Sequence, residues 1–145
     1  MTDAVVRETK RVLIVDDEPT VLAAIREYLT AYGFAVDGAG EREEAEALLL
    51  TYPYDLVIAD MRLTGIHGRE GLEVLNFVRE RQASTRVVLV TGFGSRELSE
   101  EARRRGADAF LEKPLPLSHL ASVAFRLLDM PDPYVPGLTP DERSS

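Results

Sequence analysis

The feature that most constrains the fold is an alternation between short apolar runs and longer amphipathic stretches. The runs are rich in β-branched residues, and the first, third and fourth are almost continuously apolar. They cover residues 11–16, 34–37, 55–60, 86–91 and 107–111. Strands that are buried on both faces of a parallel sheet have this composition. The sequence therefore predicts five buried strands.

The amphipathic stretches predict helices, one after each strand. The first helix is expected to begin near Pro19, a residue favoured at the first helical position, and to end at Gly33. Further helices are expected near 41–51, after Gly71, over roughly 95–105 and from about Pro116. Five strand–helix units with short connections predict an α/β fold, a doubly wound five-stranded parallel sheet with right-handed crossovers.

The same pattern sets the expected domain boundary. One domain is predicted over residues 1–130, and it accounts for nearly all of the 145-residue chain. Residues 131–145 combine prolines with few apolar side chains, so they are expected to form a Pro-rich, flexible tail. Because no second domain follows in this sequence, we expect the domain to act on its own.

Composition and charge argue against several classes of protein. Acidic residues exceed basic ones by 25 to 17, giving a net charge of -8, which argues against direct nucleic-acid binding. The absence of Cys excludes disulfides, thiolate metal sites and cysteine nucleophiles. The first ten residues do not resemble a signal peptide, and no apolar stretch approaches the ~20 residues that span a bilayer. We therefore expect a cytoplasmic protein without membrane contact.

Functional side chains follow the predicted strands. Asp16 and Asp17 follow the first strand, Asp60 ends the third, Thr91 ends the fourth and Lys113 comes just after the fifth. In an open parallel sheet, ligands bind beyond the carboxyl ends of the strands. We therefore expect these five side chains to converge at one edge of the sheet.

The residue types suggest metal-assisted phosphoryl transfer. Crowded carboxylates repel one another, by on the order of 4 kcal/mol for a pair at ~4 Å and an effective dielectric near 20. A hard cation such as Mg²⁺ relieves this repulsion. We expect Asp17 and Asp60 to bind Mg²⁺ directly, Asp16 directly or through water, and the backbone carbonyl of Arg62 to complete the set.

Catalytic roles follow from the same set. Asp60 can attack phosphorus as a carboxylate nucleophile and form an acyl phosphate. The Lys113 ammonium offsets charge on the phosphoryl oxygens, and the Thr91 hydroxyl can donate a hydrogen bond to one of them.

Four motifs resemble those of the response-regulator receiver domains of two-component signalling. They are Val15-Asp16-Asp17-Glu18-Pro19, Asp55-Leu56-Val57-Ile58-Ala59-Asp60-Met61, Val90-Thr91-Gly92-Phe93-Gly94 and Phe110-Leu111-Glu112-Lys113-Pro114. They occur in the order of that family and cover residues from about 10 to 130.

The resemblance implies a flavodoxin-like sheet of strand order 2-1-3-4-5. It also implies Mg²⁺-dependent transfer to Asp60 from a histidine kinase or a histidine phosphotransfer protein, followed by slow self-catalysed dephosphorylation. Thr91 and Phe110 would act as switch residues and change the surface around the fourth helix, fifth strand and fifth helix. The protein would be a signalling switch rather than an enzyme, a monomer or a phosphorylation-dependent dimer, and would control a downstream protein target.

The chain departs from the family pattern after Asp60. Thr64 stands where a proline is usual, and His67-Gly68 stands where an Asp-Gly pair is expected. The helical segment that begins at Gly71 comes about three residues late, so the loop after Asp60 is expected to be longer than usual.

Other interpretations of these residues remain open. An aspartyl-nucleophile phosphatase also places an Asp after a strand, but needs a second Asp two residues later, where this chain has Arg62. A structural interaction module could keep the fold without phosphorylation. Asp16 and Asp17 could merely cap the helix that follows, and Phe110 could be an ordinary core residue.

Overall fold

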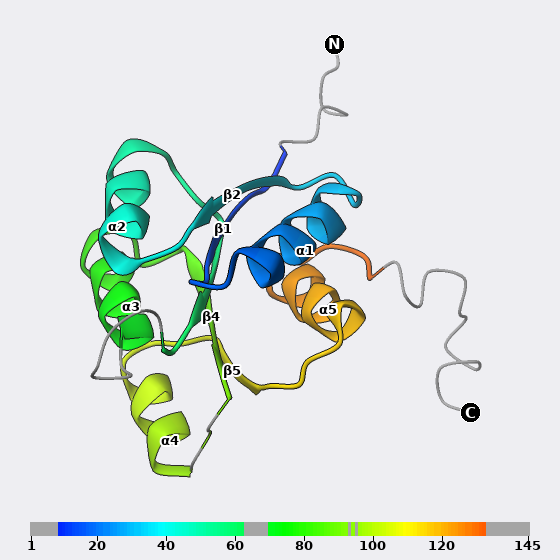
Figure 1. Cartoon of the computed structure of the whole chain (residues 1–145). Coiled ribbons are helices and arrows are strands. Elements are labelled where there is room, and N and C mark those ends of the chain that lie inside the picture. Colours follow the sequence, from blue (N-terminus) through cyan, green and yellow to red (C-terminus); the bar gives the residue numbers. More distant parts are fainter. Residues whose placement is uncertain (1–8, 63–69, 93, 95, 133–145) are drawn as a thin grey trace.

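The computed structural model describes residues 9–62, 70–92, 94 and 96–132, and the described chain alternates strictly between strands and helices (Figure 1). The strands are β1 (Arg11–Val15), β2 (Ala35–Ala39), β3 (Leu56–Asp60), β4 (Arg86–Thr91) and β5 (Ala109–Glu112). The helices are α1 (Pro19–Thr30), α2 (Arg42–Thr51), α3 (Glu70–Arg81), α4 (Arg96–Arg104) and α5 (Leu117–Leu127). All the strands pair in parallel, in the order β2-β1-β3-β4-β5.

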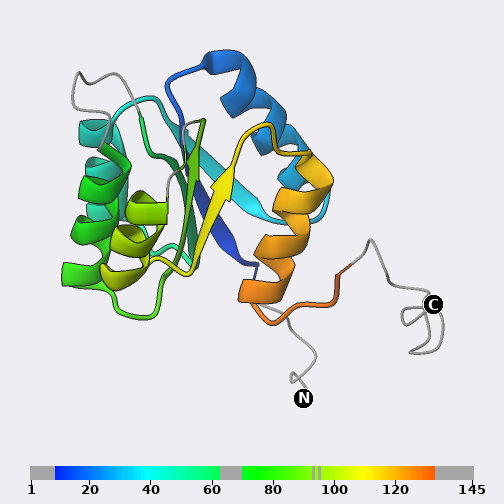
Figure 2. The ribbon, with the colours of Figure 1, turned by 90° about the horizontal axis from the view of Figure 1, so that it is seen from below.

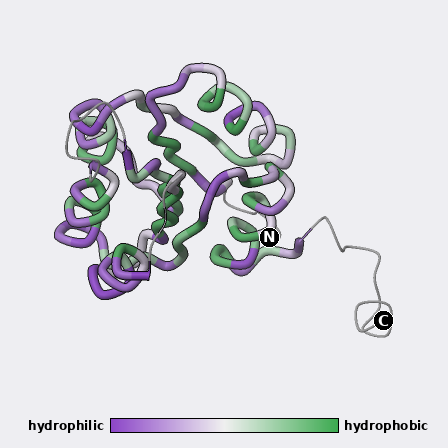
Figure 3. Tube along the Cα trace, turned by 60° about the horizontal axis from the view of Figure 1, so that its bottom comes forward, coloured by the Kyte–Doolittle hydropathy of each residue, from purple (hydrophilic) through white to green (hydrophobic). Residues whose placement is uncertain are grey.

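The sheet is the middle layer of three. Helices α1 and α5 cover one face and α2, α3 and α4 cover the other, as seen in Figure 2. Hydrophobic residues concentrate along the central strands, whereas the outer sides of the helices are hydrophilic (Figure 3). The alternation of side chains along each strand divides the core into two clusters, one on each face of the sheet. In β3, for example, Val57 belongs to the cluster under α2 and α3, and Ile58 to the cluster under α1 and α5.

The expected fold class and strand order are confirmed. The observed bounds differ by a few residues, most visibly in β5, which begins at Ala109 rather than at residue 107. Asp108 instead accepts hydrogen bonds from the Val87 backbone and the Arg79 guanidinium, both at 2.8 Å, which ties β4 and α3 to the start of β5. Among the described residues, no helix is long and apolar enough to cross a membrane. The domain boundary at residue 130 stays a prediction, because residues 133–145 lie outside those described.

The start of α3 packs closely against the end of β3. The expectation that His67-Gly68 takes the place of the Asp-Gly pair concerns residues outside the described part of the chain, so it stays a prediction. The helix begins with Glu70-Gly71, and the Gly71 N–H donates to the Met61 carbonyl at 3.0 Å. A Cβ at Gly71 would lie 2.7 Å from the Asp60 carbonyl oxygen. Gly71 is therefore the glycine that lets α3 approach the end of β3.

Candidate functional site

The site lies at the carboxyl edge of the sheet, where backbone hydrogen bonds hold the strand ends in place. The Asp16 N–H donates to the Ala39 carbonyl at 3.0 Å, and the Lys113 N–H donates to the Thr91 carbonyl at 2.8 Å. Asp60 is the last residue of β3 and is bracketed by β1 and β4. These bonds place residues that are distant in sequence beside one another, as the parallel topology requires.

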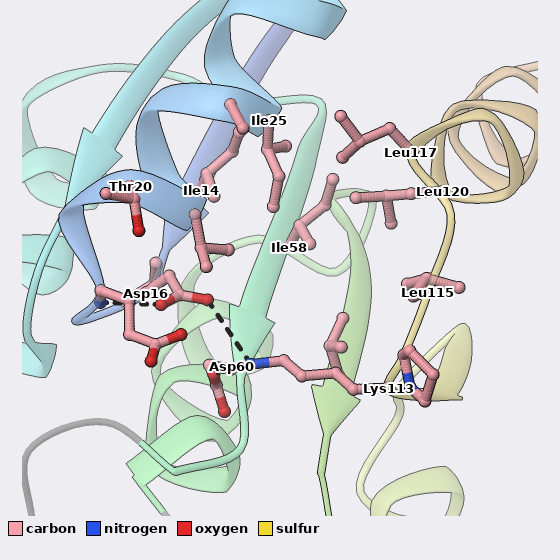
Figure 4. A pocket seen from close by; sticks show the side chains of 16 residues that line it. Ile14, Asp16, Thr20, Ile25, Ile58, Asp60, Lys113, Leu115, Leu117 and Leu120 are labelled. Carbon is pink, nitrogen blue, oxygen red and sulfur yellow. Dashed lines mark hydrogen bonds and ion pairs between the residues drawn. The ribbon is translucent and has the colours of Figure 1, made fainter.

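Two carboxylates and one ammonium form the centre of the site (Figure 4). The Lys113 Nζ lies 2.6 Å from Asp60 Oδ2 and 3.8 Å from Asp16 Oδ2. Asp60 Oδ1 accepts a hydrogen bond from the Arg62 N–H at 2.9 Å, and Asp16 Oδ1 accepts one from the Glu18 N–H at 2.9 Å. Asp16 and Asp60 are only 5% and 7% exposed, so their charges are largely removed from water.

The electrostatic balance leaves Asp16 undercompensated. Burial raises the pKa of Asp16, the Asp60 and Asp17 charges raise it further, and the Glu18 N–H and the Lys113 charge only partly offset this. Burial alone would lower the pKa of Lys113, but its hydrogen bond to Asp60 and the charges of Asp60, Asp16 and Glu18 raise it overall. Lys113 therefore remains an ammonium, and its shortest contact is with Asp60.

These donors fit a hard divalent ion that keeps much of its water. At 3.8 Å, the Lys113 ammonium forms an ion pair with Asp16 Oδ2 but is too far away for a hydrogen bond, so it compensates Asp16 less closely than Asp60. Within the described ranges, no group of three His, Asp or Glu side chains is arranged to hold a metal ion by itself. Mg²⁺ typically binds through one or two carboxylates and several waters rather than in an all-protein cage, so Asp16 and Asp60 suit it.

The remaining predicted residues lie at the same edge but not all on the same face. Asp17 is half-buried beside Asp16 and close enough for its charge to act on that residue. Thr91 is buried at the end of β4, and the alternation of side chains places it on the face of Leu89, opposite the face of Asp60. Phe110 is half-buried on the Thr91 face and borders a cavity of about 320 Å³ together with Arg96 and Ser99 of α4.

Sequence reasoning gave Glu18 no individual role, although it was part of a quoted motif. Its N–H orients the Asp16 carboxylate, and its side chain lines the cavity that reaches Asp60. The run Asp16-Asp17-Glu18 was the available signal, but which of the three acidic residues faces the site depends on the turn between β1 and α1.

Asp16→Asn is expected to stabilise the metal-free protein at pH 7, because the variant does not bury the negative charge of the Asp16 carboxylate. Asn keeps an oxygen that can accept the Glu18 N–H. We expect a higher urea midpoint for the variant in EDTA, and a larger Mg²⁺-induced rise in midpoint for the wild type. Asp37→Asn is the matched contrast and should destabilise, because Asp37 accepts from Arg11 at 2.9 Å and from the Tyr54 hydroxyl at 2.6 Å. An Asp16→Asn variant less stable than wild type in EDTA would contradict this reasoning.

Comparison with known proteins identifies the class that this fold and site define. The family model "Response regulator receiver domain" matches residues 12–125, so the chain belongs to that family. Its members are receiver domains of two-component signal transduction, which are signalling switches rather than classical enzymes. They are typically phosphorylated on an aspartate, bind a divalent metal for that reaction, and work with a histidine kinase.

Individual relatives agree with this assignment. The response regulator protein PilR of Pseudomonas aeruginosa is 31% identical over 134 residues, which cover 92% of this chain and 29% of PilR. A CheY-like receiver domain of Methanospirillum hungatei has a crystal structure with a TM-score of 0.78 and 28% identity, covering 84% of this chain and 95% of that one. A Burkholderia pseudomallei response regulator was crystallised with a phosphorylated aspartic acid, a calcium ion and citrate. It has a TM-score of 0.72 and 24% identity, over 81% of this chain and 66% of its own. The chain spans between 25% and 57% of the length of the first curated relatives.

Proposed function

We propose that this protein accepts a phosphoryl group on Asp60 from a histidine kinase or a histidine phosphotransfer protein, with Mg²⁺ as cofactor. The observation that carries the proposal is the contact of the buried Asp60 carboxylate with Lys113, with Asp16 beside both. Three side chains that come from three different strand ends are thereby gathered at one point. Family membership supplies the reaction class, and this contact supports Asp60 as the acceptor.

Each residue has a defined part in the transfer. An Asp60 carboxylate oxygen attacks phosphorus, and the bond between phosphorus and the donor nitrogen breaks as the donor leaves. The Lys113 ammonium moves from the Asp60 carboxylate to a phosphoryl oxygen, where it offsets the negative charge of that oxygen. Asp16, Asp17, Asp60 and the Arg62 carbonyl would hold Mg²⁺, which supplies charge neutralisation between acceptor and phosphoryl group.

The readout of the switch would involve Thr91 and Phe110. The Thr91 hydroxyl would donate to a phosphoryl oxygen, and its displacement would leave space into which Phe110 turns. The surface of α4, β5 and α5 would then repack and control a downstream protein. Weak anchoring of α4 supports this role, because Ala102 is its only buried residue among those described and Phe110 borders a cavity beside it.

The proposal is tested by phosphotransfer together with a Lys113→Met variant. Wild type should take up label from at least one autophosphorylated histidine kinase in a panel, and EDTA should abolish the transfer. With acetyl phosphate as donor, Lys113→Met should slow phosphorylation by on the order of a hundredfold, because the phosphoryl oxygens lose a charged donor. The same variant should bind Mg²⁺ more tightly, because the ammonium that pairs with Asp60 is gone.

The matched control is Lys10→Met, which changes the only other lysine in the chain. Lys10 precedes β1, at the end of that strand away from the site. Lys10→Met should leave both the rate and the Mg²⁺ affinity unchanged. Equal rates for the two variants, or weaker Mg²⁺ binding in Lys113→Met, would refute the assigned role of Lys113.

A further inference from the structure

A cavity of about 370 Å³ lies between α1 and α5 and reaches the phosphoryl-acceptor site. Its apolar walls come from both helices and from the face of the sheet beneath them (Figure 4). They include Val21, Ile25, Leu117, Leu120, Ile14 and Ile58. This volume is within the range of about 300–1,000 Å³ that is typical of small-molecule pockets. We call this space the α1–α5 wedge.

Aromatic rings join α1 and α5 at the ends of the two helices that lie away from the site. The Phe125 ring of α5 lies 5.7 Å from the Tyr32 ring, just after α1, and 5.3 Å from the Phe34 ring, measured between centroids. The rings meet edge-on or tilted, arrangements that aromatic pairs favour. This contact keeps the two helices together at that end, while Leu115 and Pro114 border the wedge at the end near Lys113.

The polar end of the wedge is acidic. Asp16, Glu18 and Asp60 line it with three carboxylates, and Thr20 adds a hydroxyl. Among the described lining residues, Lys113 is the one cation, and its close contact is with Asp60. An anionic ligand would face three carboxylates, whereas a cationic one would meet Asp16 Oδ2, which the Lys113 ammonium approaches only to 3.8 Å. Apolar walls with an acidic end complement a molecule that has an apolar body and a positive head.

We propose that the α1–α5 wedge binds a small organic cation, an amine on an aromatic or branched aliphatic body. The body lies between α1 and α5, and the ammonium donates hydrogen bonds to Asp16. Because the ammonium occupies the side of Asp16 that faces the site, the bound amine competes with the divalent ion. This competition rests on the proposed function, but binding of the amine itself does not.

Three probes of equal length separate the contribution of charge from that of apolar contact. They are phenylpropylamine, phenylpropanol and phenylpropanoate, each titrated into metal-free ¹⁵N-labelled full-length protein at pH 7. The amine should shift the amide signals of Val21 and Leu117 saturably, and bind about tenfold more tightly than the alcohol, as one charge-assisted hydrogen bond allows. The carboxylate should bind least. Equal affinities for amine and alcohol, or tighter binding of the carboxylate, would overturn the proposal.

Two adjacent alanines of α1 provide a matched pair of variants. Ala24 lines the wedge, whereas Ala23 does not, and both are exposed on the helix. Ala24→Leu should fill the wedge and weaken the binding of the amine by at least about tenfold. Ala23→Leu should bind the amine with the affinity of the wild type. Thermal unfolding followed by circular dichroism should show that both variants are folded. Unchanged binding in Ala24→Leu would place the amine elsewhere and refute the site.

A second titration tests the competition. Saturating amine should raise the apparent dissociation constant of Mg²⁺ severalfold in the wild type and leave it unchanged in Ala24→Leu. If the amine binds and the Mg²⁺ affinity does not change, the competition is wrong. Failure of acetyl phosphate to modify Asp60 would instead refute the proposed function, while the amine-induced shifts would still be observed.

Discussion

Wild-type protein incubated with acetyl phosphate and Mg²⁺ is expected to gain one phosphoryl group in its intact mass, and Asp60→Asn is expected to gain none. The amide oxygen of Asn is a far weaker nucleophile than a carboxylate, although the side chain keeps nearly the same shape. It can still accept the Arg62 N–H that Asp60 accepts at 2.9 Å, so the local backbone should be retained. Peptide mapping of the modified wild type should place the group within β3.

Asp55→Asn is the control for this experiment. Asp55 immediately precedes β3, at the end of the strand opposite Asp60. The Asp55 carboxylate accepts a hydrogen bond from the Arg11 N–H at 2.8 Å. It lies far from Lys113 and from the carboxyl edge of the sheet, so this variant should be phosphorylated fully. A wild type that shows no adduct, or an Asp60→Asn variant with an undiminished one, would rule out Asp60 as the acceptor.

Much of the fold could be predicted because its signals are local. The β-branched runs of β1, β3 and β4 are almost uniformly apolar, and a strand buried on both faces has no other composition available. The turn glycines Gly33 and Gly106 also lie where helices α1 and α4 end, and both have positive φ. The convergence of Asp16, Asp60 and Lys113 followed from topology alone, since parallel strands direct their carboxyl ends to one edge.

What could not be predicted depends on distances between elements. Residue spacing pointed to His67-Gly68, whereas the role of Gly71 appears only when the approach of α3 to β3 is known. The α1–α5 wedge has no sequence signature either, because its lining residues look like ordinary core positions. It lies between two helices that meet through the Phe125 ring at one end, and it reaches Lys113 at the other.

Gly71→Ala is expected to destabilise the fold by about 2 kcal/mol, in the range of overpacking substitutions. The added Cβ would lie 2.7 Å from both the Asp60 carbonyl oxygen and the Met61 Cα, and backbone atoms cannot move aside as a flexible side chain can. Alanine is favoured over glycine in a helix by about 1 kcal/mol, which partly offsets the clash. The steric cost of the added methyl group must therefore be larger than the net loss of stability. Urea unfolding gives the loss of stability.

Gly40→Ala separates this steric effect from the general effect of adding a methyl group. At Gly40 the nearest atom to an added Cβ is the Glu44 Oε1, 3.9 Å away, so the free energy of unfolding should change by no more than about 0.5 kcal/mol. Because the Gly71 clash is with the backbone of Asp60 itself, Gly71→Ala should also slow phosphorylation by acetyl phosphate under conditions where it is still folded. Equal stability of the two variants would mean that α3 can shift away from β3 at no cost. The contact of Gly71 with the end of β3 would then not be what fixes the position of the acceptor.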